Sequence, residues 1–176
     1  MNIWHDLDSR RVNKDSFIAC IEISKGSKKK YELAKETGLI ILDRILYTST
    51  HYPANYGFIP KTYSGDNDPL DVLVLCQEPL VPLTLVKCIP IGVILMMDNG
   101  AMDEKIIAIA EKDPMWNSYT DINELPPHYI REVSNFFEVY KLLEDGITAV
   151  NGSLNKEGAI KIIKEAIDRY EEHFGK

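Results

Sequence analysis

The chain has 176 residues, 45% of them hydrophobic and 27% charged, and its 20 Lys and Arg against 27 Asp and Glu leave a formal net charge of −7. This length and composition predict one globular domain with a core of its own and exclude wholesale disorder. The acidic balance argues against a general nucleic-acid or anionic-membrane binder, because such partners are bound through a surplus of Lys and Arg.

The first two thirds of the chain predict β-strands. Turn residues (Gly, Pro, Asn and Asp) separate short runs of β-branched or aliphatic residues. Strands this short and this closely spaced are typical of an antiparallel barrel or sandwich. The aromatic segment 52–60 either contributes to a binding site or packs around a turn. The predicted strands are residues 17–23, 30–34, 39–42, 71–76, 84–97 and 104–110.

The last third of the chain predicts two helices. The first begins at Pro126-Pro127 and stops before Gly146. The second begins at Asn155, a suitable N-cap, and its apolar stripe ends before Gly175. Residues 145–154 between the two helices are expected to be a linker. The apolar face of the first helix is expected to contain Ile130, Val133, Phe137, Tyr140 and Glu144, widened by Tyr129, Phe136 and Leu143.

Neither a targeting segment nor a disulfide framework is expected. The first residues lack a basic stretch followed by an apolar core, and no run reaches the roughly 20 apolar residues of a spanning helix. These features predict no membrane partner and a cytoplasmic location. Cys20, Cys76 and Cys88 are odd in number and each stands in an apolar run, so we expect buried free thiols.

The densest group of acidic residues lies at 66–71, which reads Asp-Asn-Asp-Pro-Leu-Asp. Pro69 excludes a helix interior, and an extended chain places Asp66 and Asp68 on the same side, just before Asp71 opens an apolar strand. Carboxylates this close repel one another unless a cation compensates, and Mg²⁺ accepts oxygen ligands while keeping several waters. A polar turn between strands is the alternative.

A second polar group lies at residues 98–105. Asp98-Asn99-Gly100 is good hairpin-tip chemistry, and Asp103 and Lys105 share one face if a strand begins there. Three further cations, Lys30, Arg44 and Lys141, stand beside apolar residues. They suit an anionic substrate, although a solvated or snorkelling side chain is the alternative for each.

Together these segments resemble the soluble family I inorganic pyrophosphatases over residues 17–144. The D-x-D-P-x-D signature stands at Asp66, Asp68, Pro69 and Asp71. The resemblance implies a mainly β fold with flanking helices (α+β), a five-stranded OB-like barrel in a single domain over residues 1–176. Its barrel core would cover about residues 17–110 and its helical part about 127–174. The other matching segments, in family order, are 21–23, 30–32, 43–44, 52–59, Asp98, Asp103, Lys105 and 136–141.

The resemblance also implies an activity and a set of residue roles. The activity is Mg²⁺-dependent hydrolysis of pyrophosphate to two orthophosphates, with two or more Mg²⁺ ions per site, in a homohexamer. Asp68 would be the general base, and Glu22 and Glu32 would hold metal-bound waters. Lys30 is chosen from residues 28–30 because it precedes Tyr31-Glu32. The metal carboxylates would be Asp66, Asp71 (bridging two metals), Asp103 and, when substrate arrives, Asp98. The phosphates would be held by Lys30, Arg44, Tyr56, Lys105, Tyr140 and Lys141.

Elementary chemistry agrees with this interpretation. Pyrophosphate is a multiply charged anion that repels an attacking hydroxide. Two metal ions can lower the pKa of a bound water from about 15.7 to about 7 and neutralise phosphate charge. Asp68, with an ordinary pKa of about 3.9, can accept a proton only from water acidified in this way. Arg44 offers a planar fork to phosphate oxygens, whereas lysines act as point charges.

Two other functions remain open. An OB-like barrel often binds oligonucleotides, but the net charge of −7 disfavours this function, and we expect no nucleic-acid partner. A metal-dependent phosphohydrolase that acts on another phosphoanhydride would share the carboxylates. Only a substrate panel separates that enzyme from a pyrophosphatase.

Overall fold

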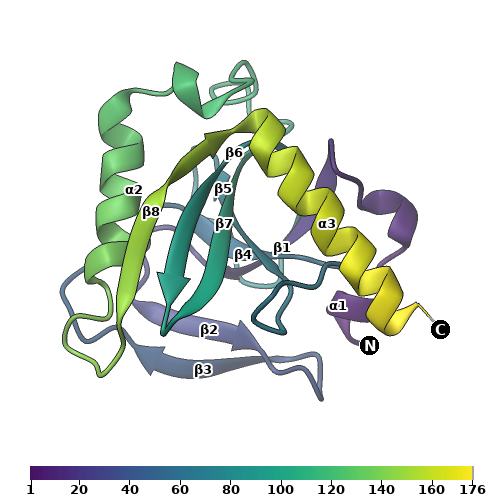
Figure 1. Ribbon diagram of the computed structural model, residues 1–176, viewed down its shortest axis with the longest axis horizontal. Coiled ribbons are helices and arrows are strands. Elements are labelled where there is room, and N and C mark those ends of the chain that lie inside the picture. Colours follow the sequence, from purple (N-terminus) through teal and green to yellow (C-terminus); the bar gives the residue numbers. More distant parts are fainter. Residues whose placement is uncertain (176) are drawn as a thin grey trace.

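The computed structural model describes residues 1–175, which form a mainly β fold with flanking helices (Figure 1). The strands contain the β-branched and aliphatic runs of the sequence, and the helices contain the segments with helical spacing. The helices are α1 (Ile3–Asp6), α2 (Pro127–Val139) and α3 (Lys156–Phe174), with 3₁₀ turns at Ser9–Arg11 and Ile122–Glu124. The strands are β1 (Phe17–Ile23), β2 (Lys29–Leu33), β3 (Ile40–Ile45), β4 (Asn55–Ile59), β5 (Leu70–Leu75), β6 (Leu85–Asp98), β7 (Ala101–Ala110) and β8 (Thr148–Asn155).

Five strands of the described chain form a closed ring. The order in the main sheet is β1-β4-β5-β7-β6-β8, and β1 also pairs with β6, as Ile18 does with Lys87. This extra pairing closes β1, β4, β5, β7 and β6 on one another and leaves β8 as an edge strand. Strands β5 and β7 run parallel, whereas the other neighbours are antiparallel. The predicted five-stranded, mainly β arrangement is confirmed. Strands β2 and β3 form a separate hairpin.

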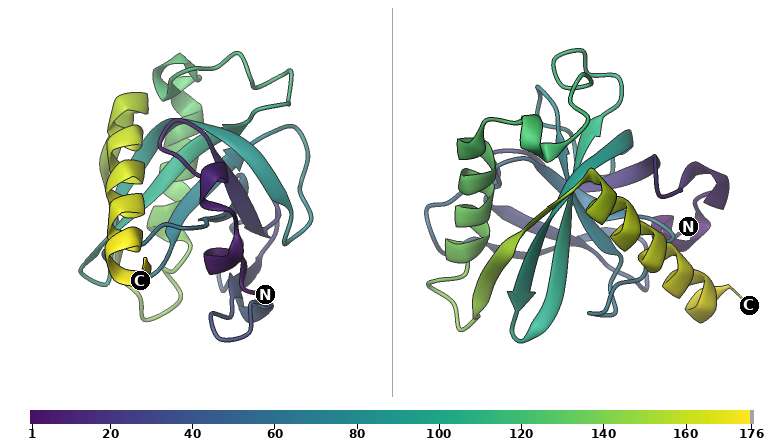
Figure 2. Two further views of the ribbon diagram at one scale, coloured as in Figure 1. Left: turned by 90° about the vertical axis from the view of Figure 1, so that its right-hand side faces the viewer. Right: turned by 45° about the horizontal axis from the view of Figure 1, so that its top comes forward.

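The core lies inside the ring and between the sheet and its two long helices. Every residue of β1 and of β4 is buried. Helix α2 packs on β8 and helix α3 on β6, on different sides of the ring (Figure 2). Phe136 and Phe137 of α2 join one apolar cluster, and Ala159 and Ile163 of α3 join a second one. The ring therefore presents a rigid frame to which the hairpin is attached.

The predicted start of each helix agrees with the structure, but the first helix ends earlier than predicted, at Val139 rather than just before Gly146. Helix α2 begins at Pro127, and Asn155 caps α3 by accepting a hydrogen bond from the Gly158 backbone N–H at 3.1 Å. Gly175 follows the end of α3. Leu143, however, is 68% exposed and does not widen the apolar face of α2, because the helix ends at Val139 and the chain then turns away.

Two strands were missed by the sequence analysis. Segment 55–59 is the fully buried strand β4, although its Tyr, Gly and Asn residues also suit a turn. Residues 148–155, expected to be a linker, form β8, which lies within the part of the chain predicted to be helical. β8 pairs with β6 along one edge, and most of its side chains are exposed. An edge strand that buries few side chains does not need alternating apolar residues, so its sequence lacks the pattern by which a half-buried strand is predicted.

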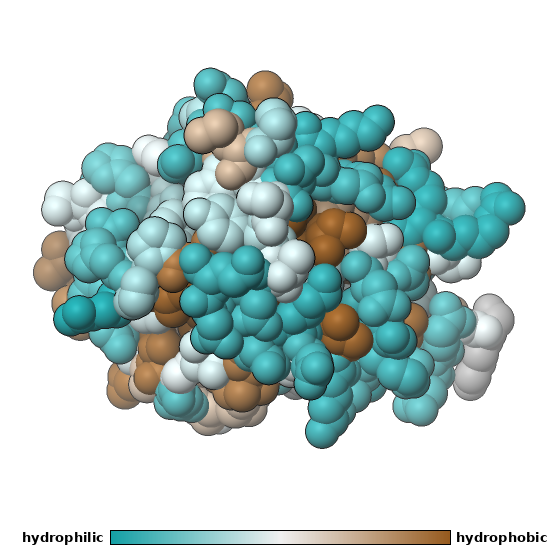
Figure 3. Space-filling view, turned by 90° about the horizontal axis from the view of Figure 1, so that it is seen from above, coloured by the Kyte–Doolittle hydropathy of each residue, from teal (hydrophilic) through white to brown (hydrophobic). Residues whose placement is uncertain are grey.

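The surface fits the composition. The face shown in Figure 3 is mostly hydrophilic, with apolar side chains in small separate groups. Cys20, Cys76 and Cys88 are all buried free thiols, as predicted. Among residues 1–175 we find no helix with the length and apolar character needed to cross a bilayer.

Candidate active site

The predicted site residues meet in one cavity of about 560 Å³. The β2–β3 hairpin lines one part of the cavity, and residues of the ring strands, of the segment before β5, of α1 and of the turn after α2 line the rest. This convergence joins positions that are more than one hundred residues apart in the sequence. The lining includes every predicted site residue except Arg44: Glu22, Lys30, Glu32, Tyr56, Asp66, Asp68, Asp71, Asp98, Asp103, Lys105, Tyr140 and Lys141.

Lys105 lies at the centre of the carboxylates because of strand register. It is the direct partner of Asp71 across the parallel pair β5–β7, and Asp103 precedes it by two residues on the same face. The Lys105 Nζ lies 2.7 Å from Asp71 Oδ2 and 2.9 Å from Asp103 Oδ2. It also donates a hydrogen bond to the Tyr56 hydroxyl at 2.9 Å. With only 4% of its side chain exposed, Lys105 is a buried cation stabilised by these oxygen atoms.

Several acidic groups in the cavity hold protons more tightly than usual. Removal from water raises the pKa of Asp66 to about 7, and the nearby charges of Asp71 and Asp103 add to the effect. Burial raises the pKa of Asp103 to about 6, although Lys105 opposes the shift. Burial also raises the pKa of Glu22 to about 8, with Asp71 contributing. Burial is the main cause of each shift and neighbouring carboxylates add to it, so a bound cation would favour the ionised form of these groups.

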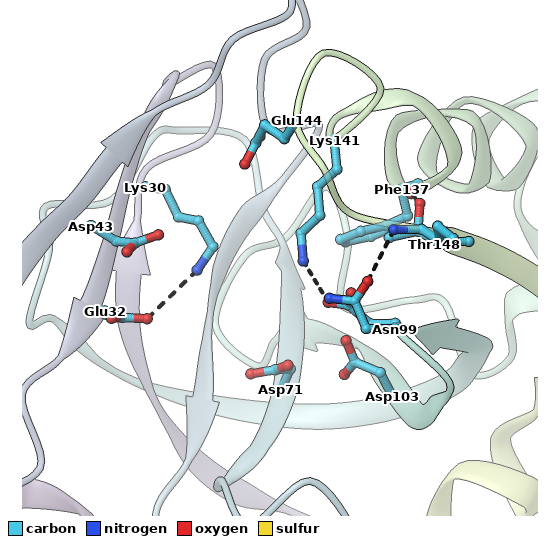
Figure 4. Close-up of polar contacts among 12 residues, drawn as sticks. Lys30, Glu32, Asp43, Asp71, Asn99, Asp103, Phe137, Lys141, Glu144 and Thr148 are labelled. Carbon is cyan, nitrogen blue, oxygen red and sulfur yellow. Dashed lines mark hydrogen bonds and ion pairs between the residues drawn. The ribbon is translucent and has the colours of Figure 1, made fainter.

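Two more lysines reach into the cavity from outside the ring. Figure 4 shows Lys30 and Lys141 extending toward the region where Asp71 and Asp103 lie. Lys141, just after α2, forms an ion pair with Asp98 at the end of β6, with 2.6 Å between Nζ and Oδ2. The Nζ of Lys30 lies 3.8 Å from the nearest oxygen of Glu32 on the same strand. Each of these cations is therefore paired with a carboxylate of the cavity.

Arg44 is the predicted site residue that does not line the cavity. It is the cross-strand neighbour of Lys30 in the hairpin, but its guanidinium contacts Asp43 and Glu144. The Arg44 Nε lies 2.6 Å from Glu144 Oε1. The sequence analysis placed Glu144 on the same helix face as several apolar residues. A carboxylate at such a position could have indicated that Glu144 has a charged partner.

Sequence reasoning assigned no site role to several other residues that line the same cavity, among them Trp4, Lys35 and Tyr52. Lys35 forms an ion pair with Asp68 and belongs to the turn of the hairpin. Trp4 is contributed by the N-terminal helix α1, and Tyr52 is almost fully buried beside Tyr56. Nothing in the local sequence around Trp4 or Lys35 indicates this proximity, because it depends on how the hairpin and the N-terminal segment fold over the ring.

The donor set of the cavity fits a hard divalent cation. Its potential ligands are carboxylate oxygens, which Mg²⁺ prefers, and a few of them suffice because Mg²⁺ keeps several waters. Within residues 1–175 no three acidic, His or Cys side chains already form a complete set of metal ligands. The positions of the lysines account for this, since Lys105 occupies the space between Asp71 and Asp103 and Lys35 contacts Asp68.

The fold and the site together define a class of protein, a closed five-stranded ring with a cavity lined by both carboxylate and ammonium groups. Such a cavity is suited to an anionic substrate. Comparison with known proteins narrows this class. The family model described as inorganic pyrophosphatase matches residues 19–171. Soluble inorganic pyrophosphatase 2 of Chlamydomonas reinhardtii is 49% identical over 172 residues, which cover 97% of this chain and 89% of that protein.

Solved structures give the same result. The inorganic pyrophosphatase of Helicobacter pylori is 44% identical with a TM-score of 0.87, over 90% of this chain and 95% of that one. The inorganic pyrophosphatase of Thermus thermophilus is 36% identical with a TM-score of 0.87, over 89% and 92% of the two chains. The chain described here belongs to the inorganic pyrophosphatase family.

Proposed function

We propose that this chain hydrolyses inorganic pyrophosphate to two orthophosphates with the help of bound Mg²⁺. The observation that carries the proposal is the cavity itself, in which the carboxylates of the D-x-D-P-x-D signature lie beside Lys30, Lys105 and Lys141. A site for pyrophosphate needs negative groups that attract divalent cations and positive groups that hold phosphate, and this cavity contains both. Membership of the family adds a second, independent line of support.

Under this proposal the acidic residues divide into three roles. Asp66, Asp71 and Asp103 would hold Mg²⁺, and Asp98 would join them in the presence of substrate. Glu22 and Glu32 would accept hydrogen bonds from metal-bound waters. When bound, Mg²⁺ lowers the pKa of a water molecule and offsets the charge of the phosphate oxygens. Burial is the main cause of the raised pKa values of Asp66, Asp103 and Glu22, and a bound cation would stabilise their ionised forms, which supports these roles.

Asp68 acts as the general base, and six other residues bind the phosphates. Asp68 accepts the proton of the attacking water, which then displaces the leaving phosphate without a covalent enzyme intermediate. Its carboxylate is about half exposed at the cavity wall, so both water and substrate can reach it. Six residues hold the phosphates and offset charge that develops on the leaving group, namely Lys30, Arg44, Tyr56, Lys105, Tyr140 and Lys141.

The ion pairs of the cavity predict that metal and substrate bind cooperatively. Lys105 and Lys141 are each paired with a proposed metal carboxylate. If a divalent cation bound these carboxylates, Lys105 and Lys141 would lose their partners, and each ammonium group could then donate hydrogen bonds to a phosphate oxygen instead. Arg44 is likewise paired with Glu144 and does not line the cavity, so we expect its guanidinium to move toward the substrate when phosphate binds. Binding of the metal is therefore expected to raise the affinity for pyrophosphate, and binding of pyrophosphate to raise the affinity for the metal.

A phosphate-release assay tests the proposal. The protein is stripped of metal with a chelator and supplied with pyrophosphate, a nucleoside triphosphate or a phosphomonoester, with and without Mg²⁺. Of the three substrates, we expect only pyrophosphate to release phosphate rapidly, and we expect this release to require Mg²⁺. Ca²⁺ should inhibit it, because its looser coordination geometry positions the attacking water poorly. Equal activity on all three substrates would favour a general phosphohydrolase. Tight binding of single-stranded nucleic acid without phosphate release would favour an oligonucleotide-binding module.

We further propose that the chain acts in the cytoplasm as a homohexamer. The support is the resemblance to family members of bacterial type and of similar length. Size-exclusion chromatography with light scattering measures the mass in solution directly. A mass near 20 kDa, that of one chain, would contradict the hexamer.

A further inference from the structure

Lys35 has no role in the site as proposed so far, yet it contacts the residue proposed as general base. Its Nζ forms an ion pair with Oδ1 of Asp68, and about half of each side chain is exposed at the wall of the cavity. Within residues 1–175, Lys35 is the cation that pairs with Asp68. The contact joins the turn of the β2–β3 hairpin to the signature segment before β5.

The backbone around Lys35 is held by two sets of contacts. Inside the turn, the Gly38 N–H donates to the Ala34 carbonyl at 2.8 Å. From outside, the Asn2 Nδ2 donates to the Lys35 carbonyl at 2.6 Å, and the ring of Trp4 lies 5.8 Å from the Lys35 Nζ. The N-terminal segment, residues 1–7, therefore fixes the hairpin turn from which Lys35 reaches the cavity.

The backbone of Asp68 is also fixed, but its side chain depends on Lys35. The Asp68 N–H donates to Asp66 Oδ1 at 3.1 Å, and its carbonyl accepts from the Ser64 N–H at 2.7 Å. Neither bond restrains the carboxylate, which faces solvent on one side. The ion pair with Lys35 restricts the rotamers of that carboxylate and holds it toward the cavity.

We propose that Lys35 is a positioning residue for Asp68 and that the N-terminal segment supports it. This inference rests on the proposed function, since it gives Lys35 its effect through the base. A base must lie within hydrogen-bond reach of the water whose proton it accepts, so a misdirected carboxylate slows the chemical step. Substrate binding depends on other cations of the cavity. Loss of Lys35 is therefore expected to lower kcat and to leave KM nearly unchanged.

The experiment compares Lys35→Ala, Lys35→Arg and Lys29→Ala in steady-state pyrophosphate hydrolysis with saturating Mg²⁺. We expect Lys35→Ala to lower kcat by about three- to tenfold, the effect of one partly exposed ion pair, with KM within about twofold of the original value. Lys35→Arg should restore most of the loss. Lys29→Ala is the matched control, since Lys29 is an exposed lysine of the same hairpin that does not line the cavity.

A double-mutant cycle shows whether Lys35 acts through Asp68. In the Asp68→Asn background, Lys35→Ala should have little further effect on the residual kcat, because the carboxylate to be positioned is gone. The same fractional loss in both backgrounds would overturn the inference, and so would an effect confined to KM, which indicates direct contact with substrate.

A variant that removes the support of the turn tests the second half of the inference. Asn2→Ser keeps a side chain able to cap α1 but cannot reach the Lys35 carbonyl, so we expect a smaller loss of kcat in the same direction. If the original chain hydrolyses pyrophosphate and the Lys35→Ala variant has the same kcat, the role of Lys35 is overturned but the proposed function is not. An original chain that does not hydrolyse pyrophosphate overturns the proposed function as well.

Discussion

Asp71 and Lys105 are direct partners across the parallel strands β5 and β7, and their charged groups lie 2.7 Å apart. The register of one strand pair thus places a buried ammonium against a carboxylate proposed to hold Mg²⁺. In the same pair, Val72 lies beside Ile106 in the core, so the register is determined by apolar packing below the site. The geometry of the charged groups depends on the packing of the barrel.

The first prediction concerns the carboxylate of Asp71. Asp71→Asn keeps the size of the side chain but removes the charge that attracts cations. We expect a loss of pyrophosphate turnover of about a hundredfold or more and a fold that stays intact, because Asp103 still pairs with Lys105. Phosphate release and circular dichroism measure the two effects. Asp145→Asn, at an exposed position outside the cavity, serves as control, and unaltered turnover of Asp71→Asn would remove Asp71 from the site.

The second prediction concerns the choice among three consecutive lysines. Lys30 lines the cavity, whereas Lys28 and Lys29 do not. Lys30→Ala removes one charged phosphate contact, so we expect KM for pyrophosphate to rise by about tenfold or more. Lys28→Ala and Lys29→Ala should leave both kinetic constants nearly unchanged. A reversed ranking in steady-state kinetics would show that a different lysine binds the substrate.

The third prediction is a pH dependence of stability without metal. The pKa values of Glu22, Asp66 and Asp103 are raised in the folded chain to about 8, 7 and 6. The folded state therefore binds more protons than the unfolded state between the ordinary pKa of these groups, near 4, and about pH 8. By linkage the free energy of unfolding falls as pH rises from about 5 to about 8, since the stability present at low pH is lost as each group ionises in the folded protein.

Urea unfolding in the presence of a chelator, at a series of pH values, measures this slope. The Asp66→Asn variant should flatten the slope near pH 7, and saturating Mg²⁺ should reduce it in the original chain by compensating the ionised carboxylates. A metal-free stability that rises over the same pH range would contradict the charge distribution described here.

The fourth prediction concerns the close packing of β1 against β4, the strand that contains Tyr56. Gly57 of β4 is the cross-strand partner of Ile21, and a Cβ atom on Gly57 would lie 1.9 Å from the carbonyl oxygen of Cys20. Gly57→Ala therefore forces β1 and β4 apart. We expect the free energy of unfolding to fall by about 2 kcal/mol or more.

Chemical denaturation measures the effect of Gly57→Ala. Gly65→Ala is the matched control, because a Cβ atom there meets open space. If Gly57→Ala were as stable as the control, β1 and β4 would not approach as closely as described.

Much of the fold could be predicted because its signals are local. β1 and β6 are largely apolar segments between turn residues, and α3 has both its cap and its apolar stripe in the sequence. The strands that escaped prediction lack such signals. β8 is exposed along most of its length, and its conformation results from pairing with β6 rather than from its own residue types.

The amino-acid sequence by itself determined which chemical groups are present and in what order: the signature acids, the strands that follow them and the cap of α3. It could not determine which charges neutralise one another. Lys35 meets Asp68 and Arg44 meets Glu144 only because closure of the ring and folding of the hairpin bring distant segments together. The physical reason is that strand and helix signals extend over a few residues, whereas ion pairing depends on distances in space, which packing of the whole core decides.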